Sequence, residues 1–142
     1  MPVRFVIGVT LALLSASSLA AQEWPRFRGP NGSGFSATVL PTRWTEKDYR
    51  WQIKLPGPGH SSPILWGERL FVTSEAAGKL HVLCLDAKSG RTHRSREIAA
   101  GPPRGHKDNN LASVTPAADA RHVYLSWGTL KEVVLLALSH DG

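Results

Sequence analysis

The chain has 142 residues, a formal net charge of +6, 42% hydrophobic residues and 20% charged residues. This length corresponds to about one domain, and the composition is that of a globular protein, which excludes an intrinsically disordered chain. The single cysteine excludes an intramolecular disulfide framework, and no apolar run reaches the roughly 20 residues of a membrane-spanning helix.

The N-terminus carries the three-part pattern of a secretory signal peptide. Arg4 is its positive residue, Phe5–Leu14 is its apolar stretch, and Ser18 and Ala20 are the small residues before a cleavage point. We therefore expect a signal peptide over residues 1–20 and an exported chain, periplasmic or extracellular, without a lipid anchor. An exported protein rarely meets nucleic acid, and the basic residues are scattered, so we expect no nucleic-acid partner.

Residues 21–49 are predicted to form an N-terminal arm without regular structure. The segment has no hydrophobic period and contains proline and glycine throughout. Trp24, Phe27 and Phe35 are too apolar for a free tail, so we expect these side chains to hold the arm against a folded surface.

Short β-strands are predicted after the arm. Trp51–Leu55 alternates apolar and polar residues, which indicates a strand, and Pro56-Gly57-Pro58-Gly59 ends it. Four more strands lie between turn-forming residues, at Ile64–Leu65, Arg69–Ser74, Leu80–Leu85 and Thr92–Ile98. Leu80–Leu85 is apolar nearly throughout, which predicts burial on both of its faces.

The sequence repeats itself at an offset of 53 residues. Ser62-Pro63-Ile64-Leu65 corresponds to Thr115-Pro116-Ala117-Ala118, and Leu80–Leu85 corresponds to Val133–Leu138. Each unit has a short strand led by proline, two longer strands, a turn and an outer strand. Four antiparallel strands in a repeat of about 40–50 residues are the blade of a β-propeller, whereas a β-sandwich has no reason to repeat so evenly.

The predicted fold is therefore all-β, a β-propeller of four-stranded antiparallel blades over residues 50–142. Trp51–Leu55 lies 43 residues before Arg94–Ile98 and is then the closing strand of a preceding blade. The second unit stops before its outer strand. We expect the chain to be an incomplete N-terminal part of a longer protein, about two blades plus one closing strand, and to be unstable or to self-associate when alone.

From Trp24 to Gly142 the sequence resembles the pyrroloquinoline-quinone-like β-propeller repeat family. Leu85-Asp86-Ala87-Lys88-Ser89-Gly90 is similar to the turn of that repeat. Trp24-Pro25-Arg26-Phe27-Arg28-Gly29-Pro30, Leu40-Pro41-Thr42 with Trp44, and Gly59-His60-Ser61-Ser62-Pro63 resemble the N-terminal segment of an exported bacterial branch, similar in fold to the outer-membrane assembly propeller. The family's turn is usually followed by a docking tryptophan. Arg94 stands at the position of this tryptophan. Only the partial copy has a tryptophan there, which is Trp51.

The family also includes quinone-dependent dehydrogenases, and the resemblance implies for them a Ca²⁺ site, a catalytic carboxylate and an adjacent cysteine pair. This chain has only Cys84 and no cluster of the acidic ligands that Ca²⁺ requires. We therefore expect no pyrroloquinoline quinone, no other cofactor, no metal and no catalytic residue. Cys84 is expected to be a small buried hydrophobe, and Trp66, Tyr124 and Trp127 are expected to pack between blades.

Two polar segments precede the innermost strands of the two units and are therefore expected at the same rim of the propeller. Their candidate contact residues are His60, Ser61, His106, Lys107 and Asn109. The last three belong to an insertion, Ala99–Leu111, and insertions in propellers often form the binding face. We expect these side chains to contact a protein partner or a polar ligand. The alternative is that they bond only to loop backbone.

Three functional hypotheses follow from these observations. The first is an exported, non-enzymatic β-propeller that acts as an interaction or ligand-binding scaffold. The second is the N-terminal part of a quinone-dependent dehydrogenase-type propeller whose catalytic residues lie beyond Gly142. The third is a small independent binding module similar to a β-sandwich.

Overall fold

The computed structural model describes residues 23–101 and 109–141. The predicted signal peptide and the candidate residues His106 and Lys107 lie outside the described residues. The described part is all-β apart from one short 3-10 turn, η1 (Glu46–Asp48), so the all-β part of the predicted fold is confirmed. Among the described residues, no helix is long and apolar enough to cross a membrane.

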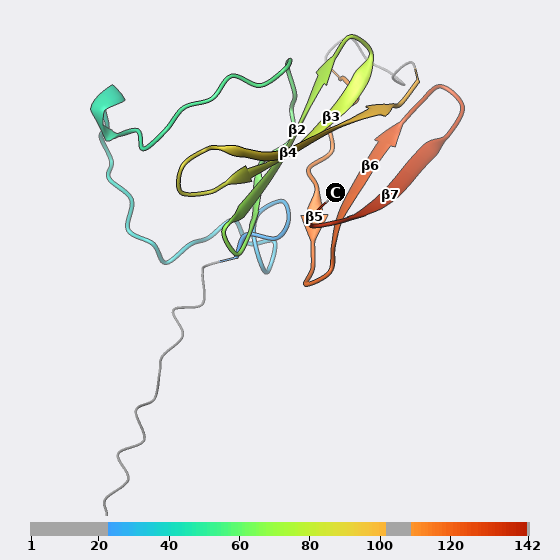
Figure 1. Cartoon of the computed structure of the whole chain (residues 1–142). Helices are drawn as coiled ribbons and strands as arrows, with labels where there is room; N and C mark the ends of the chain where they lie inside the picture. The colour runs from blue at the N-terminus through green and yellow to red at the C-terminus, as the bar shows by residue number, and fades with distance from the viewer. Residues whose placement is uncertain (1–22, 102–108, 142) are drawn as a thin grey trace, which may run out of the picture.

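The strands form two antiparallel sheets in which each strand pairs with its neighbour in the sequence (Figure 1). The four-stranded sheet contains β1 (Ile64–Trp66), β2 (Arg69–Ala76), β3 (Lys79–Asp86) and β4 (Thr92–Ala99). The three-stranded sheet contains β5 (Ala117–Ala118), β6 (His122–Gly128) and β7 (Val133–Ser139).

The register of the two sheets shows that the sequence repeat is also a structural repeat. Ile64 of β1 pairs with Phe71 of β2, and Ala117 of β5 pairs with Tyr124 of β6, so both partners shift by the same 53 positions. Every pair between β6 and β7 likewise has its counterpart between β2 and β3 at that offset. The predicted repeat is therefore confirmed strand by strand.

The two sheets stack face to face and share one hydrophobic core. Alternate residues of a strand point to the same face of its sheet, and the facing sets meet between the sheets. The core includes Ile64, Phe71, Leu80, Val82 and Cys84 from the first sheet and Val123, Leu125, Trp127 and Leu138 from the second. Trp66 packs against it. Tyr124 lies on the opposite face of β6 from the core residues, so it does not pack between these two sheets.

The outer faces of the two sheets differ. On the first sheet, Leu83 and Leu85 are buried in a second cluster against which Leu55 packs. This confirms the predicted two-sided burial of β3. On the second sheet, Val133 and Leu135 of β7 are 72% and 76% exposed. No described segment covers that face.

The N-terminal arm is attached through its backbone. Trp24 and Leu65 of β1 exchange two N–H···O bonds of 2.9 Å, and the Pro25 carbonyl accepts a bond of 2.7 Å from the Ala118 N–H of β5. The arm therefore bridges the innermost strands of both sheets, as predicted for Trp24. The prediction is wrong for Phe27 and Phe35, which are exposed because the chain turns away from the sheets after Pro25. The following segment loops away from both sheets (Figure 1).

The predicted strand at Trp51–Leu55 is wrong. These residues have no partner strand among the described residues and form no regular structure. Leu55 instead packs on the first sheet, where it covers the cluster around Leu85. The chain then crosses β2, where the Glu75 N–H donates to the Pro58 carbonyl at 2.8 Å.

Candidate functional site

The segment that contains His60 and Ser61 lies beside the chain around Ala112, which follows the described end of the second polar segment. The backbone N–H groups of His60 and Ser61 both donate to the Ala112 carbonyl, at 3.1 and 2.9 Å. This contact joins the chain that leads into β1 to the chain that leads into β5. His60 and Asn109 are exposed at this place. We call these two side chains and the backbone around Ala112 the rim site.

Part of the predicted rim is structural. The hydroxyls of Ser61 and Thr73 are 2.7 Å apart and share a hydrogen bond, and the Ser62 N–H donates to the Thr115 hydroxyl at 2.9 Å. The Ser61 hydroxyl therefore holds its loop to β2, which is the kind of bonding that the alternative expects. No hydrogen bond joins the side chain of His60 or Asn109 to another of the residues that the structure describes.

Glu75 supports the rim and was missed by the sequence analysis. Its Oε2 accepts a bond of 2.6 Å from the Leu111 N–H. Asn110 completes the turn, because its Oδ1 accepts from the Ala112 N–H at 3.0 Å. The only signal in the sequence was a carboxylate near the end of β2, which does not predict its partner.

Trp51 docks on the turn between β3 and β4. Its Nε1–H donates to the Ala87 carbonyl at 3.1 Å, and its ring lies over Gly90, where an added Cβ would stand 2.5 Å from a ring carbon. Gly90 has φ of +72°, a conformation that glycine adopts without strain. The Asp86 carboxylate accepts from the Ser89 hydroxyl at 2.7 Å, which keeps this turn closed.

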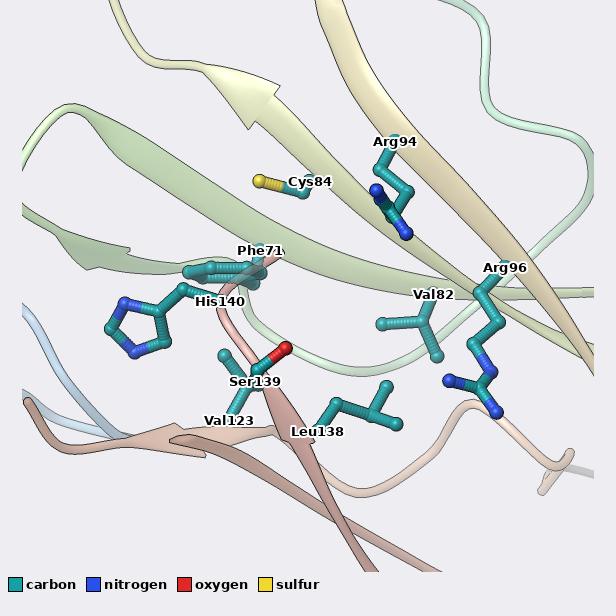
Figure 2. Close-up of a pocket in the computed structure, with 9 residues that line it drawn as sticks. All are labelled: Phe71, Val82, Cys84, Arg94, Arg96, Val123, Leu138, Ser139 and His140. Carbon is teal, nitrogen blue, oxygen red and sulfur yellow. The ribbon is translucent and has the colours of Figure 1, made fainter. Parts of the chain in front are cut away.

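Arg94 corresponds to Trp51 at the offset of 43 residues. The turn of the second unit therefore has no tryptophan docked on it among the described residues. Arg94 lines a narrow crevice between the sheets, together with Arg96, Cys84 and His140 (Figure 2). His140 corresponds to Ala87 at the offset of 53 residues, so this crevice occupies the place that the Trp51 ring fills in the first unit. Figure 2 shows both arginines projecting from β4 over the crevice.

Cys84 is buried in the wall of this crevice, as predicted. Burial raises the pKa of its thiol, and this effect outweighs the opposing influence of Arg69. A raised pKa keeps the sulfur in its unreactive protonated form. The chemistry of Cys84 is thus that of a packing residue.

Within residues 23–101 and 109–141, no three side chains of His, Cys, Asp or Glu gather as a metal site would require. No model of a known protein family, no curated protein and no solved structure matches the chain. The resemblance to the propeller repeat family therefore rests only on the residues quoted in the sequence analysis.

Asp119 is the centre of a small hydrogen-bond cluster on the second sheet. Its carboxylate accepts bonds of 2.8 Å from the N–H groups of Arg121 and His122 and from the Tyr124 hydroxyl. The two backbone bonds and then the Tyr124 bond lower the pKa of Asp119 from 3.8 to about 2. A carboxyl group whose pKa is lower in the folded chain stabilises the fold at pH values above its unfolded pKa, which is near 3.8. This stability is lost as the pH falls toward 2.

We expect Asp119→Asn to flatten the fall of the melting temperature between about pH 4 and pH 2, as measured by circular dichroism. An equally steep fall in the variant would contradict the assignment.

Proposed function

We propose that the chain is an exported, non-enzymatic scaffold built from β-propeller repeats of the pyrroloquinoline-quinone-like type, which binds a protein partner or a polar ligand at the rim site. The observation that carries this proposal is the pair of hydrogen bonds from His60 and Ser61 to Ala112. They bring the loops in front of both innermost strands together and leave His60 and Asn109 exposed on a fixed backbone. An imidazole and a carboxamide held in this way offer both donors and acceptors to one ligand.

Two further observations support the propeller repeat over a self-contained sandwich. The register of both sheets is the same at the offset of 53 residues, and Trp51 docks on the turn of the next unit. A self-contained sandwich keeps polar residues on its outer faces. The second sheet instead exposes Val133 and Leu135 there.

The rim site is tested by selecting binding peptides from a displayed library on the full chain and measuring their affinities for variants. His60→Ala and Asn109→Ala are expected to weaken such binders at least tenfold, because hydrogen bonds to the ligand are lost, with little change in melting temperature. His93→Ala and Asn31→Ala are the matched controls, since these residues lie outside the rim. Binders that respond equally to all four variants, or to none, would contradict the proposal. A large fall in melting temperature for His60→Ala or Asn109→Ala would show that the segment is structural.

A further inference from the structure

The N-terminal arm contains an asparagine that is followed directly by a glycine, Asn31-Gly32. The other asparagines of the chain, Asn109 and Asn110, are followed by Asn110 and Leu111. Glycine has no Cβ, so the nitrogen of its peptide bond is open to the preceding side chain. Asn31 is exposed, and its carboxamide makes no hydrogen bond with another of the residues that the structure describes. Asn31 is therefore chemically distinct from the other two asparagines.

Asn31 and Gly32 lie in a tight turn. The Gly32 N–H donates to the Gly29 carbonyl at 3.1 Å, and Pro30 and Asn31 occupy the two central positions, as in a β-turn. The backbone nitrogen next to the Asn31 side chain is therefore held by a hydrogen bond for as long as the turn stays closed.

Arg26 holds this turn closed. Its Nη2 donates to the Pro30 carbonyl at 2.9 Å, and its Nε donates to the Gly29 carbonyl at 3.3 Å. An added Cβ at Gly32 would stand 3.7 Å from the same Nη2, so the guanidinium lies beside the peptide bond between Asn31 and Gly32. Hydrogen bonds from a charged donor are stronger than neutral ones. We call the two bonds from Arg26 the Arg26 clamp.

We propose that Asn31 is a site of spontaneous deamidation and that the Arg26 clamp sets its rate. When the turn opens, the Gly32 nitrogen loses its proton to water and attacks Cγ of Asn31. A C–N bond forms, the bond from Cγ to the carboxamide nitrogen breaks, and this nitrogen takes a proton from water and leaves as ammonia. Water then hydrolyses the five-membered imide at either carbonyl, which yields aspartate or isoaspartate. The ring closure is intramolecular, and this proximity makes it fast.

Both products change the arm. Each replaces a neutral carboxamide by a carboxylate, which lowers the net charge of the chain from +6 by one unit. Isoaspartate also adds one carbon to the main chain, which disrupts the turn between Gly29 and Gly32. The arm is attached to both sheets through Trp24 and Pro25, which precede the turn. The reaction therefore alters the charge and shape of the arm and leaves the two sheets intact.

The test is incubation of the folded full chain at neutral pH, followed by peptide mapping with mass spectrometry. Deamidation is expected at Asn31 before Asn109 or Asn110 has reacted. Arg26→Ala should raise the rate at Asn31 about threefold or more, because loss of the clamp increases the population of the open turn. Arg43→Ala is the matched control and should leave the rate unchanged, since it removes the same charge from an exposed part of the arm outside the turn.

Two further measurements separate the clamp from the chemistry. The chain unfolded in urea gives the rate of the open turn, which should exceed the rate of the folded chain. Gly32→Ala should slow the reaction even in urea, because its methyl group hinders the attack on Cγ. The proposal would be overturned by a folded chain that does not react at Asn31, by equal rates in Arg26→Ala and the unmodified chain, or by a Gly32→Ala variant that reacts as fast. Circular dichroism verifies that each variant is folded before incubation.

Discussion

Replacing Trp51 by alanine is expected to lower the free energy of unfolding by about 2–4 kcal/mol, because a large, half-buried side chain is replaced by a small one. The change removes the ring that covers Gly90 and the hydrogen bond from Nε1 to the Ala87 carbonyl. It also uncovers the apolar groove beside Leu55 and Leu70. Urea denaturation followed by circular dichroism measures the effect.

The matched control is Trp44→Ala. Trp44 lies on the arm and is 62% exposed, and a surface substitution of this kind changes stability by no more than about 0.5 kcal/mol. Equal effects of the two substitutions would mean that the docking of Trp51 contributes nothing specific. A larger effect at Trp51 would support its role as the link between consecutive repeat units.

Gly57→Ala is the second substitution with a large expected effect. An added Cβ at Gly57 would stand 1.9 Å from the Glu75 carbonyl oxygen, which is backbone of β2. The crossing segment must then move away and lose the bond between the Glu75 N–H and the Pro58 carbonyl. Overpacking of this kind costs about 1–3 kcal/mol, and the lost hydrogen bond adds about 1 kcal/mol.

Gly67→Ala separates this steric effect from backbone strain. Gly67 has φ of +58°, and an added Cβ would meet no atom within 4 Å. The only cost is that of a non-glycine residue in the left-handed region, about 1–2 kcal/mol. Both variants are compared by thermal and urea denaturation. A Gly57→Ala variant as stable as Gly67→Ala would show that the chain does not cross β2 so closely.

The local features of the fold could be predicted from the sequence. The strands of both units, the turns between them and the offset of 53 residues follow from hydrophobic periods and turn-forming residues, which act over a few positions. The continuous apolar run of β3 also predicted its burial on both faces, because side chains alternate between the faces of a strand. The contact of His60 and Ser61 with Ala112 agrees with the repeat, since the segments that lead into equivalent strands of stacked units lie next to each other.

Other features depended on residues that are distant in the sequence. Trp51–Leu55 has the alternation of a strand, but the chain brings no partner edge beside it among the described residues, so its side chains pack on the first sheet instead. Glu75 binds the Leu111 N–H across 36 positions, and Phe27 stays exposed although it is as apolar as a core residue. A hydrophobic period in the sequence indicates which side chains of a segment favour burial. The surface that buries them exists only after the two sheets have stacked.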